Sequence, residues 1–338
     1  MIPAWVQSTG KVLVSIAITM FGLLLVTFII SRMLPADPVL AIVSDHASEE
    51  VIAAARVKLG LNHSLPVQFL IYIWQVMQGD LGISLRTNNP ILTDLARVFP
   101  ATLELATWGI VIGVLLGVPL GVLGAVRKDS WIDNVIRFVG LVGYSMPIFW
   151  LGIIGLLIFY AELDWLPGPG RLDFGYEDII TPVTGIMTID TLIAGDTDLF
   201  WNAVAHLILP ASLLGYYSLA YISRMTRSLM LGQLLQEYIL TARVKGVSES
   251  RIIWKHAMGN ILVPLLTVVA LSYGTLLEGS VLTETVFTWN GLGLYITNSI
   301  FGQDLPAVMG GTIVVGFVYI IINTLTDIAH RFLDPRAR

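Results

Sequence analysis

The sequence predicts an all-α polytopic membrane protein with six transmembrane helices. Of its 338 residues, 55% are hydrophobic and only 13% are charged, whereas a soluble domain carries roughly a quarter charged residues. Eight stretches of at least 19 residues contain no Asp, Glu, Lys or Arg, and about 20 apolar residues are needed to cross a hydrocarbon layer about 30 Å thick. This composition argues against a soluble enzyme.

Two of the eight stretches are poor candidates for spans. Polar residues and Pro66 interrupt residues 59–79, and Thr, Asn, Gln and Gly run through residues 285–303. Both are expected to be interfacial or loop segments. The six predicted transmembrane helices are residues 12–31, 100–126, 133–160, 204–229, 258–282 and 305–330.

The distribution of Lys and Arg predicts the orientation, because cytoplasmic loops are enriched in them. The connection 230–257 and the segment between the second and third spans are rich in basic residues, whereas the loop 161–203 has Arg171 alone against eight acids. We therefore expect residues 1–11 and 331–338 to be cytoplasmic, and the loops 32–99, 161–203 and 283–304 to be extracytoplasmic. The apolar stretch 12–31 has no obvious cleavage site and is expected to be retained.

This topology divides the charge of the chain by side. The net charge of −5 separates into 13 basic and 6 acidic residues inside, and 6 basic and 18 acidic residues outside. An acidic chain is not typical of a general nucleic-acid binder. The absence of cysteine removes disulfides, thiol nucleophiles and thiolate metal sites.

The outer loops are long enough to hold structure of their own. Residues 48–60 predict an amphipathic helix with Ser48 as its N-cap and Gly60 at its end, and a second helix is expected at 66–78. The sequence LPGPG at 166–170 predicts a turn. We expect these loops to pack over the membrane.

The inner loop 230–257 predicts two short helices. In residues 233–246, Leu235, Tyr238 and Ala242 share one helical face, Gly246 suits a left-handed C-cap, and Ser248 suits the next N-cap. An ordinary interfacial helix is one interpretation. A docking element for a cytoplasmic partner is the other, because exposed Leu and Tyr among alternating charges suit insertion into a groove.

Small residues line one face of the second predicted span. They recur every four residues, a spacing that lets helix backbones approach closely in lipid, at Gly109, Gly113, Gly117 and Gly121. Prolines interrupt or flank the second to fifth spans, at Pro119, Pro147, Pro210 and Pro264. Ordinary helix packing explains most of these residues, and a bundle that moves is also compatible with them.

Charges within the spans are scarce. Glu278 and Glu284 fall at the outer end of the fifth span and Asp327 at the inner end of the sixth. Because all three lie near an interface, we expect solvation to be cheap there. No titratable residue lies near mid-span, which counts against an ion-coupled secondary transporter.

Catalytic motifs are missing from the sequence. It contains no GxxxxGK[ST] and no HExxH, and its five histidines are dispersed. The partial GxS at Ser145 would fit an intramembrane hydrolase, but Met146 and Pro147 follow it and the sixth span has no mid-span histidine. Ser145 is better interpreted as a helix-end hydroxyl, and the chain as a passage rather than an enzyme.

The inner loop carries a recognisable signature. EYILTARVKG (237–246) followed by NILVP (260–264) resembles the cytoplasmic loop of binding-protein-dependent ABC importer permeases, and most closely the peptide/nickel branch. TGIMTID (184–190) resembles the first permease subunit of dipeptide transporters. The similarity also covers GDLGIS (79–84), FPATLEL (99–105), GYSMPIFW (143–150), HLILPA (206–211), RMTRS (224–228), LTETVFTWNGLG (282–293) and DPR (334–336).

This resemblance implies a type I ABC importer permease fold in a bacterial inner membrane. It implies half of a permease heterodimer, served by two cytoplasmic ABC ATPases and an extracytoplasmic substrate-binding protein. ATP and Mg would be bound by the ATPases, and no cofactor or metal by this chain. The implied substrates are dipeptides or short oligopeptides, with antimicrobial peptides, haem-like compounds and nickel chelates as alternatives.

The resemblance also implies roles for individual residues. Contacts that couple the chain to the ATPases would come from Glu237, Tyr238, Thr241, Ala242, Arg243, Lys245, Gly246, Ser248 and Arg251. The substrate path or gate would involve Ser145, Met146, Pro147, Glu278, Glu284 and Trp289. The chain departs from the family pattern at Leu240, where the general signature has Glu, and at Asn290, where the family has Pro.

Overall fold

The computed structural model describes residues 4–33, 48–50, 56–57, 62–176 and 179–333. Within these ranges the chain is helical, and the only strand-like pairing is an isolated bridge between Ile83 and Pro90. The prediction of an all-α protein is confirmed.

Long apolar helices dominate the described chain. The segments long and apolar enough to cross a membrane are Ile91–Val126, Thr197–Leu234, Glu249–Glu278 and Leu305–Ala329. They belong to helices α5 (Ile91–Val126), α9 (Thr197–Leu234), α12 (Met258–Val286) and α14 (Leu305–Leu333). Helix α1 (Ala4–Met33) adds the shorter apolar stretch Val14–Ile30.

The third predicted span is not one straight helix. Helix α6 (Trp131–Ser145) is followed by α7 (Ile148–Gly155) and a π-helical turn, η1 (Leu156–Glu162), and the axis bends by 99° between α6 and α7. Met146 adopts an extended conformation with ψ 136°, as a residue before proline tends to do. Pro147 has no N–H to continue the helical hydrogen bonds, so the helix ends here.

Shorter helices occupy the predicted loops. Helix α4 (Leu65–Met77) and helix α13 (Leu292–Phe301) lie in the stretches 59–79 and 285–303, which are expected to be interfacial or loop segments. Helix α8 (Met187–Ala194) lies in the loop 161–203. Of the helix expected at 48–60, residues 51–55 and 58–60 lie outside the described part, and the described residues 49–50 and 56–57 are helical.

The chain divides into two compact units. The first comprises the described residues of 1–99 and 295–321. In it α1 packs against α4, where Phe28 meets the Phe69 ring at 5.2 Å and Thr27 shares a hydrogen bond of 3.2 Å with the Tyr72 hydroxyl. Ser84 donates to the buried Asp304 at 2.6 Å.

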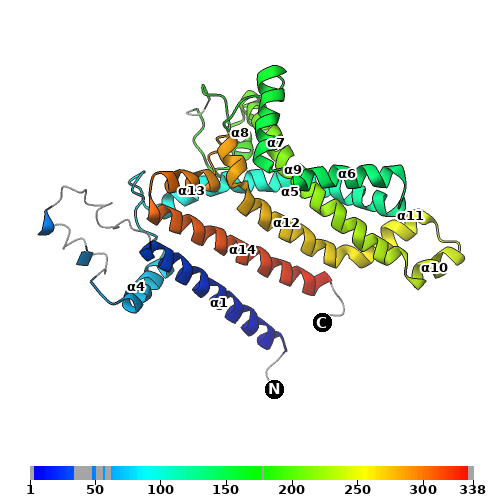
Figure 1. Cartoon of the computed structure of the whole chain (residues 1–338), viewed down its shortest axis with the longest axis horizontal. Helices are drawn as coiled ribbons and strands as arrows, with labels where there is room; N and C mark the ends of the chain where they lie inside the picture. Colours follow the sequence, from blue (N-terminus) through cyan, green and yellow to red (C-terminus); the bar gives the residue numbers. More distant parts are fainter. Residues whose placement is uncertain (1–3, 34–47, 51–55, 58–61, 177–178, 334–338) are drawn as a thin grey trace. The chain divides into compact units, whose positions relative to one another are not determined.

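The second unit comprises the described residues of 100–294 and 322–338, and α9 is its central helix. Helix α9 packs against α6, α7, α8 and α12, and it runs beside α6 and α12 in Figure 1. After α9 come α10 (Glu237–Val244), α11 (Glu249–Arg251) and a second π-helical turn, η2 (Ile252–Ala257), which leads directly into α12. The second of the two predicted inner helices is therefore the start of a long one.

Candidate functional site

A tight turn joins α10 to α11. Gly246 has φ +77°, a left-handed conformation that suits a residue without a side chain. Its N–H donates to the Arg243 carbonyl at 2.9 Å, and the Val247 N–H donates to the Ala242 carbonyl at 3.1 Å. These bonds satisfy carbonyls that the end of α10 would otherwise leave open.

The segment α10 is anchored from one side only. Ile239 is fully buried in an apolar cluster that includes Met230 of α9 and Ile261 of α12. The Tyr238 hydroxyl donates to Gln233 Oε1 at 2.8 Å and accepts from Asn260 Nδ2 at 2.9 Å. These contacts hold α10 against the ends of the two long helices.

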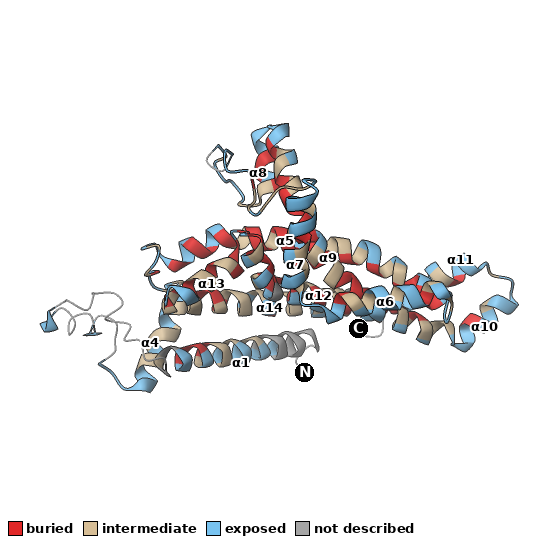
Figure 2. Cartoon of the chain, turned by 45° about the horizontal axis from the view of Figure 1, so that its top comes forward, coloured by how far each residue is buried: buried red, intermediate tan, exposed pale blue. Residues whose placement is uncertain are grey.

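The opposite side of α10 is exposed, and most of the helix has the colour of exposed residues in Figure 2. Its large apolar side chains there are Leu240 and Val244, which are 63% and 82% exposed, and Leu235 just before it is 83% exposed. Glu237, Thr241, Lys245 and Arg251 are also exposed, whereas Ala242 is half-buried. The exposed apolar side chains at Leu235, Leu240 and Val244 are called the α10 face below.

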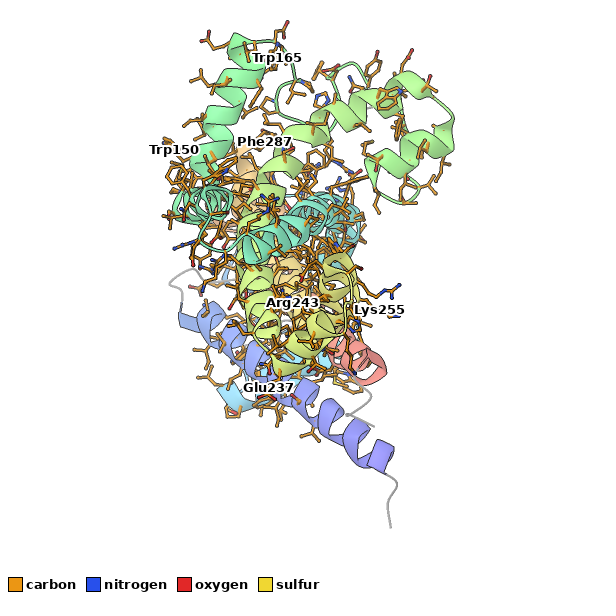
Figure 3. All side chains as sticks on the ribbon, turned by 90° about the vertical axis from the view of Figure 1, so that its right-hand side faces the viewer. Trp150, Trp165, Glu237, Arg243, Lys255 and Phe287 are labelled. Atoms are coloured by element: carbon orange, nitrogen blue, oxygen red, sulfur yellow. The ribbon has the colours of Figure 1, made fainter. Side chains whose placement is uncertain are left out.

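A surface ion pair spans the Gly246 turn. Arg243 Nε donates to Glu249 Oε1 at 2.8 Å and Nη2 donates to Oε2 at 3.2 Å. The hydrogen bond to this carboxylate raises the pKa of Arg243. Ser248 occupies the N-cap position of α11 in an extended conformation, as predicted, although its side chain makes no capping hydrogen bond. Figure 3 looks toward this end of the molecule, where Glu237, Arg243 and Lys255 are labelled.

The glycine face of α5 lies directly against α9. A Cβ built on Gly109 would lie 2.8 Å from Leu214 Cβ, and one on Gly121 would lie 2.6 Å from the Ser223 carbonyl oxygen. Gly113 faces Ser218, and Gly117 faces Ile222. Any larger side chain at these positions would push the two helices apart.

On the predicted outer side, a buried ion pair fixes the loop 161–203 to α5. Arg171 Nη2 donates to Glu104 Oε2 at 2.6 Å, and the two side chains are 12% and 1% exposed. Glu104 also accepts from the Thr188 N–H at 2.8 Å and the Thr188 hydroxyl at 2.7 Å, at the start of α8. Arg171 and Glu104 are called the outer latch below.

Glu284 is buried, which corrects the expectation that it would be solvated near the interface. It accepts from the Thr102 hydroxyl at 2.7 Å, the Ser280 hydroxyl at 3.0 Å and the Leu294 N–H at 3.0 Å. It lies beyond the apolar span Glu249–Glu278. Burial raises the pKa of Glu284, and the hydrogen bonds that it accepts oppose that rise. Glu278, in contrast, is exposed.

The other expected gate residues separate into two groups. Trp289 is 1% exposed and donates through Nε1 to the Ala101 carbonyl at 2.9 Å, so it acts as an internal anchor in this structure. Ser145, Met146 and Pro147 are exposed at the break between α6 and α7. At the other end of α7, Trp165 lies beyond η1, and Figure 3 labels it with Trp150 of α7 and Phe287 at the end of α12. The structure does not bring the break and Trp289 together as one set of lining residues.

No metal centre emerges from the part of the chain that the structure describes. Among these residues, no three His, Asp or Glu side chains lie close enough together to hold a metal ion. The arrangement offers an exposed docking face, close helix packing and buried polar anchors, rather than reactive groups.

Two family models match the chain. Residues 117–338 match the inner membrane component of binding-protein-dependent transport systems, and residues 9–106 match the N-terminal part of such membrane components. Together these matches cover the long helices and the α10 segment.

Curated relatives match over almost the full chain. The probable D,D-dipeptide transport system permease protein DdpB of Escherichia coli K12 is 44% identical, over 93% of this chain and 92% of its own length. The dipeptide transport system permease protein DppB of Alkalihalophilus pseudofirmus is 41% identical, over 94% of this chain and 95% of its own. The di/tripeptide permease DppB of Pseudomonas aeruginosa is 42% identical, over 95% of both chains.

The fold also has a solved counterpart. A chain of the MetNI methionine ABC transporter, in an inward-facing conformation, superposes with a TM-score of 0.52 at 17% identity. The match covers 73% of this chain and 99% of the other. At this identity the likeness concerns the fold alone.

Proposed function

Because the chain belongs to the family of inner-membrane components of binding-protein-dependent transport systems, we propose that it forms half of the translocation path of an ATP-driven importer of dipeptides or short oligopeptides. The observation that carries this is the 41–44% identity to dipeptide permeases over more than nine-tenths of the chain. As a member of this family, the chain is a transport subunit and not an enzyme.

The proposed assembly contains a homologous second permease, two cytoplasmic ABC ATPases and an extracytoplasmic substrate-binding protein. The ATPases would bind ATP and Mg. The charge distribution supports this arrangement, because the predicted inner segments are basic and the predicted outer loops are acidic. Both termini would then be cytoplasmic in a multi-pass inner-membrane protein.

The α10 segment is the proposed contact with an ATPase. Its inward side is fixed by Ile239 and Tyr238, so a push on α10 would be transmitted to α9 and α12. Its outward face presents Leu240 and Val244, which suit an apolar groove. In this proposal Leu240 supplies an apolar contact at the position where the family signature has Glu.

Uptake measurements test the substrate. Cells without their own peptide importers would express this permease with its partner subunits, and we expect uptake of labelled Ala-Ala that disappears when the ATPases are inactivated. Haem and a nickel chelate serve as comparison substrates. Peptide uptake that continues without the ATPases, or uptake of only a comparison substrate, would contradict the proposal.

A pair of substitutions tests the coupling. Gly246→Pro forces φ near −65° where the turn needs +77°, so substrate-stimulated ATP hydrolysis in proteoliposomes should fall to the basal rate. Gly246→Asn is the matched control, because Asn tolerates the left-handed region and no atom lies within 4 Å of a Cβ at this position. Wild-type stimulation in the proline variant would exclude a coupling role for this turn.

A further inference from the structure

An arginine lies over two tyrosine rings, one of them stacked on a third, where α6 ends beside α9. The Arg224 guanidinium carbon is 4.9 Å from the centre of the Tyr144 ring and 5.8 Å from that of Tyr221. The Tyr144 ring is stacked on Tyr217, with centroids 6.2 Å apart and planes 13° apart. Arg224 and Tyr144, Tyr217 and Tyr221 are called the arginine–tyrosine cluster below.

The charge of Arg224 is not neutralised by a carboxylate of the described chain. Arg227, one turn further along α9, pairs with the buried Asp133 of α6 through two hydrogen bonds of 2.6 Å. No such ion pair involves Arg224 among the described residues, and its side chain is exposed. Arg224 lies near the inner end of the predicted span 204–229, and an unpaired cation in a span is a candidate for a functional site.

The direction of the Arg224 side chain argues against a role at the inner membrane surface. Asp133 and Tyr144 are 11 residues apart on α6, which corresponds to about 16 Å of helix rise. The guanidinium contacts Tyr144, so it extends away from the level of the Asp133 pair and from the basic inner connection. A side chain that reached for the inner headgroups would extend the opposite way.

The cluster itself is polar, although exposed apolar side chains of the same helix surround it. Phe138 and Leu141 of α6 are 66% and 64% exposed. The arginine–tyrosine cluster instead presents phenol hydroxyls and a guanidinium, and the exposed Ser145 adjoins it. Such groups are costly in hydrocarbon and suit a wall of a water-filled passage.

From these observations we infer that the arginine–tyrosine cluster receives the α-carboxylate of the transported peptide. The inference rests on the proposed function and assigns a binding site to it. A guanidinium binds a carboxylate through two parallel hydrogen bonds. The tyrosine rings hold the guanidinium in place through cation–π contacts, and they offer flat apolar surface to the peptide side chains.

The test compares a free dipeptide with its C-terminal amide. The complete transporter in proteoliposomes is supplied with binding protein saturated by Ala-Ala or by Ala-Ala-amide, and uptake is measured for wild type and Arg224→Gln. The variant-to-wild-type ratio for each peptide removes the binding protein's own preference. We expect the ratio to fall about tenfold or more for the free acid and to change little for the amide, with partial rescue by Arg224→Lys.

The controls separate the alternatives. Arg137→Gln is the control variant. It removes an exposed arginine that lies on α6 and outside the cluster, so it should change the uptake of the two peptides equally. Parallel loss of both peptides in Arg224→Gln, or loss of neither, would overturn the inference. An effect that requires anionic lipid in the vesicles and is equal for both peptides would identify a lipid phosphate as the occupant, and would also overturn it. If wild type imports neither peptide, the proposed function fails and the inference fails with it; import by wild type without selective loss in the variant refutes the inference alone.

Discussion

The outer latch makes a quantitative prediction for Arg171→Met. Methionine keeps much of the length of the side chain and removes its charge. It leaves Glu104 buried, with the Thr188 donors but without the guanidinium at 2.6 Å. The Arg171 hydrogen bond to the Gly185 carbonyl, at 2.9 Å, is lost as well.

The magnitude follows from burial. With Glu104 1% and Arg171 12% exposed, the pair belongs to the buried class, in which removal of one partner costs about 3–5 kcal/mol. About 1.4 kcal/mol corresponds to a tenfold change in an equilibrium constant. The population of the open state of the loop 161–203 should therefore rise roughly a hundredfold or more.

Hydrogen exchange of the α8 amides measures this opening directly. We expect α8 to exchange about a hundredfold faster in Arg171→Met than in wild type. In the control Arg97→Met, the lost arginine is 63% exposed and lies 3.4 Å from the buried Asp94. Asp94 keeps its hydrogen bonds from Thr87 and Asn89, so the cost should stay below about 1 kcal/mol and α8 exchange should stay near wild type.

A double variant tests the electrostatic cause. Glu104→Gln with Arg171→Met removes both charges, so α8 should exchange more slowly than in Arg171→Met alone. An exchange rate of Arg171→Met within twofold of wild type would refute the reasoning. A double variant that is no better protected than the single one would show that packing, rather than the uncompensated charge, dominates.

Two further substitutions have defined outcomes. Gly113→Leu should lower the free energy of unfolding by at least about 1–3 kcal/mol, because Ser218 of α9 occupies the space that the side chain needs. The loss should appear as a lower midpoint of thermal unfolding in detergent. Gly232→Ala is the control: no atom lies within 4 Å of a Cβ there, so it should be neutral or stabilising. Burial raises the folded-state pKa of Glu284 above the usual glutamate value of 4.5. Its contribution to stability should therefore be present below about pH 4.5 and lost as the pH rises through the folded-state pKa. Glu284→Gln should remove this part of the pH dependence of unfolding, and an unchanged pH profile would contradict the prediction.

Local patterns in the sequence were sufficient for much of the fold. Hydropathy located the long helices and excluded the two stretches that hold α4 and α13. The turn at Gly246 was also predictable, because a glycine after a helical stretch that ends in basic residues is a local signal for a left-handed cap. These features depend on neighbours within a few residues.

The break between α6 and α7 was not predictable from proline alone. Pro100 and Pro119 lie inside α5, and Pro210 lies inside α9. Among these four prolines, Pro147 alone follows a residue in the extended conformation and accompanies a bend of 99°. Whether a proline interrupts a helix depends on the helices that pack around it, and a single sequence does not contain that information.

Buried carboxylates were missed for a related reason. Glu284 takes a hydrogen bond from Thr102, 182 residues earlier in the chain, so its position near a span end gave no sign of its burial. A weak signal was present in the outer loop, where Arg171 is the only basic residue among eight acids. A lone basic residue in an acidic loop has a carboxylate as its natural partner, and Glu104 fills that role.

The π-helical turn η2 lets the chain carry an extra residue without turning α10 away. In an α-helix one residue corresponds to about 100° of rotation, so a plain insertion would turn everything that precedes it by that angle. A π-helical turn holds one residue more than an α-helical turn, and the wider stretch Ile252–Ala257 therefore takes up the extra residue within the same full rotation. A chain with one residue fewer here and an α-helical turn in its place would present the α10 face in nearly the same direction.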